Sequence, residues 1–538
     1  MLSRLMRYTT FTLCIVLALA SAVLMFTLSG WFVISFLVFG FLTALGVSDL
    51  IQTQHAILRN YPVLGHIRYI FEMIRPEIRQ YLLESDHDEE PFSREDRNIV
   101  YQRAKDIEDK RPFGTKEHVY DSGYQWLTHS IRPKKITDHD FRVRVGGPDC
   151  KQPYDLSIYN ISAMSFGALS ANAILALSKG AKMQGFAHDT GEGGISRYHR
   201  EGGGDLIYEI GTGYFGCRTD DGAFDPEKFR KVAADPQVKM IELKLSQGAK
   251  PGQGGVLPAA KITPEIAEAR GVPMGVDCHS PNWHSTFSTP IEMMQFIARL
   301  RELSDGKPVG FKLCLGHRRE FMCIVKAMLK TGITPDFIVV DGKEGGTGAA
   351  PLEFANHMGM PLVEGLTFVH NALRGAGLRD RVKIGASGKL IHAFDIARAL
   401  ALGADWANSA RGFMFAIGCI QAQACHTNHC PSGVATQDPS RQRALVVSDK
   451  APRVANFHRN TMKALADMAG AAGLTHPSGF VPWHLMMREK DRDMVTGEDV
   501  FPYMPEGFLL REDDERFGYM KRWRRASADS FEPFDDGV

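Results

Sequence analysis

The sequence predicts an α/β fold, a (β/α)8 TIM barrel, joined to an N-terminal two-helix transmembrane hairpin. Three observations predict it: a long uncharged N-terminal stretch, eight short β-branched runs that alternate with helical patterns, and glycine-rich segments after several of those runs. The chain has 538 residues, which exceeds the roughly 250 that such a barrel needs. Its 44% hydrophobic residues exclude wholesale disorder, and its net charge of +1 gives no support to a nucleic-acid partner.

The uncharged stretch comes first, because no Asp, Glu, Lys, Arg or His occurs between Tyr8 and Ser48. About 20 apolar residues cross a bilayer core, so the stretch matches two spans that turn at Ser29-Gly30. Basic residues precede the first span and follow the second: Arg4, Arg7, Arg59 and Arg68. Positive flanks favour the cytoplasmic side. We therefore expect an inner-membrane protein whose catalytic domain is cytoplasmic.

Two other interpretations of this stretch exist. Ala20-Ser21-Ala22 has the small-residue form of a signal-peptide cleavage site, but apolar sequence continues well beyond it. A buried hairpin of a soluble protein is the second. The whole chain is divided into a hairpin over residues 1–50, a helical membrane-proximal segment over 51–150, a barrel domain over 151–477 and a C-terminal extension over 478–538.

The barrel is predicted from strands and helices that alternate over about 260 residues. The expected strands cover residues 158–162, 186–189, 240–245, 273–277, 309–314, 337–341, 382–386 and 405–409. Helical patterns between them include residues 169–183, 290–303, 319–330 and 390–402. A doubly wound sheet is the alternative, but no GxGxxG follows the first strand.

Several expected strands are followed by glycine-rich segments, which would lie on the C-terminal face where barrels build their active sites. Met164-Ser165-Phe166-Gly167 follows the first strand, and Thr190 begins the segment after the second. Gly345 and Gly346 lie in the segment after the sixth. Glycine lets backbone N–H groups approach a ligand closely. These residues are candidates for binding a cofactor.

The loops after the seventh and eighth strands usually form a phosphate site in such barrels. Here they supply Ser387, Gly388, Ser409, Ala410 and Arg411. Backbone amides and a cation at this place suit a phosphorylated cofactor such as FMN. On the fifth strand, Lys312 lies in an apolar run, and a buried lysine needs a partner. We expect it to face the ligand, where it would stabilise an anionic reduced flavin.

Three of the nine cysteines follow the eighth strand within twelve residues: Cys419, Cys425 and Cys430. Their spacing favours an iron–sulfur cluster, with Cys430-Pro431 closing the loop. Structural zinc completed by His426 or His429 is an alternative, although the close C-x2-C pair is absent. Unligated reduced thiols are the third.

The stretch from Ser162 to about Pro477 resembles the FMN-binding synthase domain of glutamate synthase. The resemblance rests on five motifs: residues 164–167, 190–194, 247–255 (Gln-Gly-Ala-Lys-Pro-Gly-Gln-Gly-Gly), 345–351 (Gly-Gly-Thr-Gly-Ala-Ala-Pro) and 418–437 with the three cysteines. It implies a barrel that carries FMN and a 3Fe-4S cluster in the 418–437 loop.

The resemblance also implies a site for 2-oxoglutarate and its imine, formed by Glu192, Gln247, Lys250 and Arg270, with Lys312 beside the flavin. Cations suit the two carboxylates of such a substrate. The implied reaction condenses ammonia with a 2-oxo acid and delivers a hydride from reduced FMN, which the cluster refills. Because no NAD(P)H-binding fingerprint is present, a ferredoxin or a separate reductase subunit is the expected electron donor.

The chain departs from the family pattern at several positions. It begins with Met-Leu-Ser where the whole enzyme has a glutaminase domain with an N-terminal cysteine, so we expect no glutamine hydrolysis by this chain. Residues 280–285, 341–344 and 386–388 differ on the expected substrate side. The first of these loops carries Trp283 and His284 and follows His279, three candidates for substrate specificity. These differences leave the substrate open between 2-oxoglutarate and a related 2-oxo acid, and the chain resembles the stand-alone, membrane-anchored members of the family.

Two other function classes remain at this stage. A membrane-bound electron-transfer flavoprotein would pass electrons to or from a quinone or a redox partner without amino-acid chemistry. A scaffold without cofactors is the third class, and the three-cysteine loop argues against it.

Overall fold

A computed structural model of the chain describes residues 7–84, 90–490, 493–511 and 518–532. Arg4 and parts of the C-terminal extension lie outside these residues. The chain forms two compact units, residues 1–94 and 95–538, and each is described by itself.

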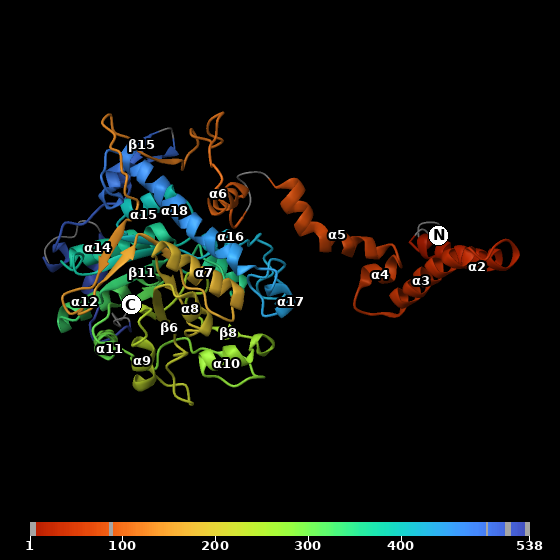
Figure 1. The fold of residues 1–538 in the computed structure, drawn as a ribbon, viewed down its shortest axis with the longest axis horizontal. Coiled ribbons are helices and arrows are strands. Elements are labelled where there is room, and N and C mark those ends of the chain that lie inside the picture. The colour runs from red at the N-terminus through yellow and green to blue at the C-terminus, as the bar shows by residue number, and fades with distance from the viewer. Residues whose placement is uncertain (1–6, 85–89, 491–492, 512–517, 533–538) are drawn as a thin grey trace. The chain divides into compact units, whose positions relative to one another are not determined.

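The first unit consists of helices (Figure 1). Its helices are α2 (Thr9–Thr27), α3 (Phe32–Ile51), α4 (Ala56–Asn60), α5 (Gly65–Ile78) and the π-helical turn η1 (Arg79–Leu83). α2 and α3 pack against each other as a hairpin and have mean hydropathies of 2.3 and 2.0. By length and composition both can cross a membrane.

The second unit is built around a closed barrel of eight parallel strands (Figure 1). In barrel order the strands are β4 (Tyr159–Ile161), β5 (His188–Asp189), β6 (Leu206–Ile210), β7 (Val238–Lys244), β10 (Val309–Leu313), β11 (Phe337–Asp341), β12 (Lys383–Ser387) and β13 (Trp406–Ser409). β13 pairs with β4 to close the ring. The predicted (β/α)8 class is confirmed.

Two of the strand predictions need correction. The third strand is β6, which the sequence analysis missed, so residues 240–245 form the fourth strand rather than the third. Residues 273–277 form no strand: Gly275 has a positive φ of 82°, and Met274 and Val276 are 57% and 54% exposed. An apolar run interrupted by proline and glycine does not pair in a central sheet. β6 is fully buried, so it lacks the alternation that identifies a half-buried strand.

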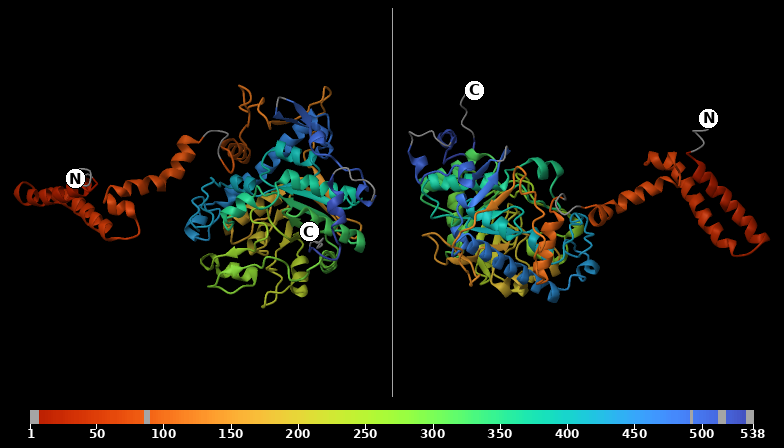
Figure 2. Two further views of the ribbon diagram at one scale, coloured as in Figure 1. Left: turned by 180° about the vertical axis from the view of Figure 1, so that it is seen from behind. Right: turned by 90° about the horizontal axis from the view of Figure 1, so that it is seen from above.

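Helices cover the outside of the barrel (Figure 2). They are α7 (Ala171–Gln184), α8 (Arg197–Gly202), α9 (Pro226–Ala233), α11 (Pro290–Leu303), α12 (Arg318–Thr331), α14 (Leu362–Gly375), α15 (Ala393–Ala401), α16 (Arg411–Ala416) and the long α18 (Val447–Ala471). The start of α11 follows from its sequence: Thr289 accepts from Glu292 N, Glu292 caps in return, and Pro290 takes the first position.

A long excursion separates β7 from α11 and forms part of the C-terminal face. It contains β8 (Val256–Leu257), the 3-10 turn η2 (Ala259–Lys261), α10 (Pro264–Arg270) and β9 (Cys278–His279), and β8 pairs antiparallel with β9. The other elements are α6 (Arg94–Ala104), β1 (Gln125–Leu127), β2 (Arg142–Val145), β3 (Tyr154–Ser157), α13 (Leu352–His357), α17 (Pro439–Gln442), η3 (Pro477–Gly479), η4 (Pro482–His484), β14 (Leu485–Arg488), β15 (Met494–Thr496), α19 (Gly497–Val500), η6 (Phe508–Leu510) and α20 (Met520–Arg524).

Candidate active site

The loops at the C-terminal ends of the strands pack against each other. The loop after β7 meets the loop after β11, where Gly248 N donates to the Asp341 carboxylate over 2.7 Å. A Cβ at Gly248 would lie only 1.8 Å from the Gly342 carbonyl oxygen, so only glycine allows this approach. The glycine-rich segments therefore form one continuous face.

Glu192, in the loop after β5, is the centre of this face. Its carboxylate lies 3.1 Å from Lys244 Nζ at the end of β7, and both side chains are largely buried. Burial alone would raise the pKa of Glu192, but Lys244, Arg270 and Lys250 together hold it below its usual value. Three cations around one carboxylate leave an excess of positive charge, which suits an anionic substrate.

Lys250 and Arg270, both in the β7–α11 excursion, lie near enough to Glu192 to act on it electrostatically. Lys250 is 3% exposed and donates to the Gly254 carbonyl over 2.5 Å, and burial lowers its pKa. Arg270 is 6% exposed, lies over the Phe215 ring at 5.0 Å and reaches the Phe166 carbonyl. Gln247 lies half-buried at the start of the excursion. The structure thus brings Glu192, Lys250 and Arg270 together.

The three specificity candidates differ in their surroundings. His284 is buried. Its Nδ1 forms a hydrogen bond of 3.1 Å with Tyr214 Oη, and its Nε2 forms one of 2.9 Å with the Lys244 carbonyl oxygen. Burial lowers the pKa of His284 to about 4, so it is neutral and supports the backbone of Lys244. Trp283 is 75% exposed, and His279 is exposed too. Only His284 is built into the site.

Lys312 on β10 pairs with Glu242 on the neighbouring strand β7 and with Glu209 on β6. Because β6 is not next to β10 in the sheet, the Lys312 side chain must point into the barrel. The Glu242 carboxylate lies 3.2 Å from Lys312 Nζ. Asp189 on β5 offers a third carboxylate within 4.8 Å of the other two. Burial, and then Glu209, raise the pKa of Asp189 to about 7. The pKa of Lys312 is raised by its acidic neighbours against the effect of burial.

The residues expected at the phosphate site lie at the ends of β12 and β13. Ser387 ends β12, and its Oγ lies 3.3 Å from Ser162 Oγ. Gly388 follows with φ 154°, and Ser409 and Ala410 lead into α16. Arg411, the first residue of α16, donates to the Gly346 carbonyl over 2.7 Å.

The other cofactor candidates surround the same mouth. Met164 and Thr190 are buried at the ends of β4 and β5. Thr190 Oγ1 accepts a hydrogen bond of 3.1 Å from Glu209 N. This bond connects Thr190 to β6, the strand on which Glu209 pairs with Lys312. Ser165 lies against Gly191, where a Cβ would come within 2.6 Å of Ser165 N. A Cβ at Gly345 would lie 3.6 Å from Ala249 N, so Gly345 faces the loop after β7.

The cysteine loop packs on this face through its backbone. A Cβ at Gly348 would lie 3.1 Å from His426 N, and Lys261 Nζ donates to the Cys425 carbonyl over 2.9 Å. Tyr101 donates to the Cys419 carbonyl over 2.6 Å. The loop therefore contacts both the β11 loop and the excursion that carries Lys250.

All three cysteines of the loop are free. Burial, with smaller contributions from the neighbouring Cys425 and Cys430 thiols, raises the pKa of Cys419 to about 11. Despite burial, the pKa of Cys430 is lowered by the Ser432 hydroxyl and by backbone N–H groups that include those of Ser432 and Ala435. Such hydrogen bonds to sulfur are typical of iron–sulfur ligands.

The described residues contain one close group of possible metal ligands, and the cysteines are not part of it. Tetrahedral Zn–S bonds of about 2.3 Å hold the ligand atoms within about 4 Å of one another. Within the described part of the chain, three such ligands gather within 4.8 Å only at Asp189, Glu209 and Glu242. His426 and His429 are exposed.

Sequence reasoning missed several residues of this face. Lys244, Glu209, Glu242 and Lys261 are all buried ionisable residues. The first three lie within apolar strands. An ionisable residue inside an apolar run was therefore the sequence feature that could have identified them. Lys261 lies in a short turn between two motifs and gave no such signal.

The sequence is similar to several known proteins. The family model described as the conserved region in glutamate synthase matches residues 149–475. The glutamate synthase large subunit-like protein YerD of Bacillus subtilis (strain 168) is 40% identical over 491 residues, which cover 84% of this chain and 93% of YerD. The archaeal glutamate synthase (NADPH) of Methanocaldococcus jannaschii is 34% identical, over 65% of this chain and 65% of its own.

Another relative is the archaeal-type glutamate synthase (NADPH) of Thermotoga neapolitana, at 34% identity over 58% of this chain and 59% of its own. Among solved structures, a flavocytochrome b2 mutant with pyruvate bound aligns with 78% of this chain and 85% of that chain, at a TM-score of 0.42 and 12% identity.

Proposed function

Because the chain belongs to the glutamate synthase family of oxidoreductases, which act on CH–NH2 donors, we propose that it reductively aminates a 2-oxo acid with FMN and a 3Fe-4S cluster. The observation that carries this proposal is the buried Glu192 carboxylate among Lys244, Lys250 and Arg270. The substrate is 2-oxoglutarate or a 2-oxo acid close to it.

Each residue of the Glu192 cluster has a distinct task in this reaction. Lys250 and Arg270 bind the carboxylates of the 2-oxo acid, because a point charge and a planar fork together fix its orientation. Glu192 stays ionised at neutral pH because its pKa is lowered, and it accepts a hydrogen bond from the nitrogen of ammonia or of the imine. Lys244 holds Glu192 in place. Gln247 orients the substrate from the rim.

The residues at the β12 and β13 ends suit FMN by the chemistry of their donors. Arg411, the hydroxyls of Ser387 and Ser409 and the backbone around Gly388 and Ala410 would hold the phosphate. Met164, Ser165, Thr190, Gly345 and Gly346 would line the ring system. When bound, FMN would supply the hydride. Lys312, whose buried ammonium group pairs with Glu209 and Glu242 inside the barrel, is the residue we propose to lie beside the flavin.

The cysteine loop suits the cluster by its three free thiols and by the N–H groups around Cys430. We propose Cys419, Cys425 and Cys430 as its ligands, with a ferredoxin or a separate reductase subunit as the electron donor. We further propose that α2 and α3 hold the enzyme in the inner membrane with the barrel on the cytoplasmic side. Nothing in the site favours the electron-transfer alternative over amination.

The decisive experiment is an optical titration of the purified protein after reduction by dithionite. We expect the oxidised flavin band to return when ammonium and 2-oxoglutarate are both added, and not with either alone. Glutamine in place of ammonium tests the nitrogen source, and other 2-oxo acids test the substrate.

Glu192→Gln provides the matched control, since it keeps the shape of the side chain and removes its charge. It should retain flavin and lose the response to the substrate pair. Reoxidation by a quinone, with no response to any 2-oxo acid and nitrogen donor, would contradict the proposed amination.

A further inference from the structure

Helix α5 carries an apolar stripe on one side. Ile67, Ile70, Phe71, Ile74 and Ile78 recur at intervals of three and four residues, which places them on one face of the helix. Ile67, Ile70 and Phe71 are 48%, 51% and 59% exposed. The residues that follow in η1 continue the stripe with the exposed Leu82. This much exposed apolar surface on one helix indicates a binding surface.

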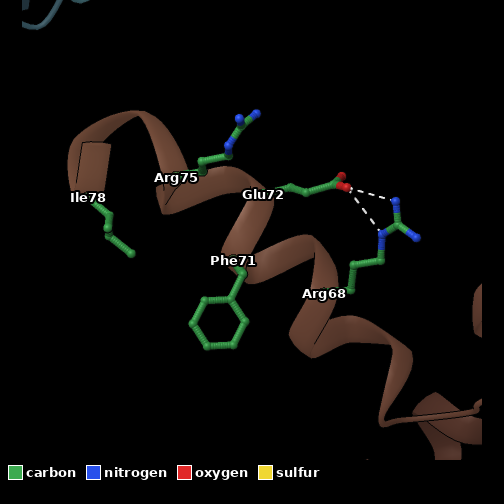
Figure 3. A pocket seen from close by; sticks show the side chains of 5 residues that line it. All are labelled: Arg68, Phe71, Glu72, Arg75 and Ile78. Carbon is green, nitrogen blue, oxygen red and sulfur yellow. Dashed lines mark hydrogen bonds and ion pairs between the residues drawn. The ribbon is translucent and has the colours of Figure 1, made fainter. Parts of the chain in front are cut away.

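Arginines flank this stripe. Figure 3 shows Phe71 and Ile78 on one side of α5 and Arg68, Glu72 and Arg75 on the other. Arg68 donates to Glu72 one turn away, at 3.0 and 3.1 Å. With Arg75, this flank holds two guanidinium groups and one carboxylate. Its positive excess is complementary to an anionic surface.

The start of α5 is tied to the end of α3. Asp49, in the last turn of α3, accepts hydrogen bonds from Val63 N over 2.9 Å and from His66 Nε2 over 2.8 Å. Asp49 is only 3% exposed. If α3 spans a membrane, its end lies at the membrane surface, and these bonds place the first turn of α5 at the same level.

We propose that α5 lies in the plane of the membrane surface, with its apolar stripe in the boundary between headgroups and acyl chains and with Arg68 and Arg75 at the phosphates of anionic lipids. Helices with one apolar face and a cationic flank bind membranes in this way. Guanidinium groups bind phosphate in a forked geometry. This inference rests on the proposed membrane attachment through α2 and α3, and is independent of the amination chemistry.

The experiment measures the depth of single positions in the full-length protein, inserted in vesicles that contain brominated lipids. Phe71→Trp reports on the stripe, and Glu72→Trp, its neighbour on the flank, is the matched control. The emission of the unsubstituted protein is subtracted. We expect bromine to quench the tryptophan at position 71 at least about twofold more strongly than the tryptophan at position 72. An aqueous quencher should show the opposite order.

A second arm tests the charged flank. Arg75→Glu in the Phe71→Trp background should weaken quenching in vesicles that contain phosphatidylglycerol, and change it little in pure phosphatidylcholine. Equal quenching at positions 71 and 72 would overturn the proposal. So would a tryptophan at 71 shielded from both quenchers, because protein would then cover the stripe.

Alkaline extraction of the same vesicles separates the two proposals. Release of the protein would contradict insertion of α2 and α3. Retention without quenching at position 71 would contradict only the position of α5. The reductive amination assay is unaffected by either result.

Discussion

Lys244 shows how one side chain can determine the electrostatics of the site. It is largely buried and contacts Glu192 at 3.1 Å, while its own carbonyl is held by His284. Removing it leaves the Glu192 carboxylate with only the more distant Lys250 and Arg270. The loss of one partner of a charged hydrogen bond costs about 1.5–3 kcal/mol.

Lys244→Met should therefore lower kcat/KM for the 2-oxo acid by about ten- to a hundredfold, as measured by steady-state rates over a range of substrate concentrations. The control is Lys239→Met, on the same strand, because Lys239 reaches Asp205 only across 3.8 Å at the surface. Equal effects of the two substitutions would contradict the role given to Lys244.

Asp189 makes stability depend on pH. Its pKa is raised to about 7 in the folded protein, by burial first and then by Glu209, whereas an unfolded Asp titrates near 3.8. Between these values the folded state binds more protons than the unfolded state, so this group lowers the free energy of unfolding as the pH rises from about 4 to about 7. Above pH 7 its contribution is constant.

Asp189→Asn keeps the acceptor for Gly191 N, which lies 2.9 Å from Asp189 Oδ1, and removes the titration. We expect its melting temperature to fall less than that of the unsubstituted protein between pH 5 and pH 7. Parallel melting curves for the two proteins across this range would show that Asp189 is ionised throughout.

At the scale of elements, the cysteine loop depends on contacts with its neighbours. Cys425→Ser should remove the broad iron–sulfur absorbance and leave the flavin bands, because the serine keeps the loop contacts but is a poor cluster ligand. Cys323→Ser, at a buried cysteine on α12, is the control and should keep both sets of bands. An unchanged spectrum for Cys425→Ser would rule out the proposed ligand set.

The contact between the β7 and β11 loops allows no side chain at Gly248. Gly248→Ala should destabilise the protein by about 1–3 kcal/mol, because the added Cβ would lie 1.8 Å from the Gly342 oxygen and the loops must move apart. Calorimetry gives the melting temperature. Gly316→Ala is the matched control after β10, since no atom lies within 4 Å of its Cβ position. It should melt like the unsubstituted protein.

For the whole molecule, the division at residue 94 predicts that the N-terminal helical part and the barrel part are separable. Removing residues 1–50 should leave weak, salt-sensitive membrane binding through α5, because an interfacial helix holds less firmly than a spanning one. Removing residues 1–94 should leave a soluble, coloured protein. Fractionation at low and high salt measures both. Firm membrane attachment of the shorter protein would place an anchor within the barrel unit.

Much of the architecture follows from local pattern. The uncharged stretch, the alternation of strands and helices and the position of Lys312 on an inward-facing strand site were all predictable. The prediction failed at β6 and at residues 273–277, because a fully buried short strand shows no alternation, and because Met274 and Val276 are apolar yet exposed. Glu192 and Lys250 lie in the family motifs, Arg270 came from the family resemblance alone, and the structure brings the three together.

The sequence by itself determined the fold class, the family and the three-cysteine loop, since each is written in residue types at short spacing. Only the tertiary structure decided which charges meet. The Glu192–Lys244 pair joins the loop after β5 to the end of β7 across 52 positions, and the Lys312–Glu209 pair joins two strands across 103 positions. Their contact depends on the order and stagger of strands around the barrel. That order includes β6, which local pattern did not identify.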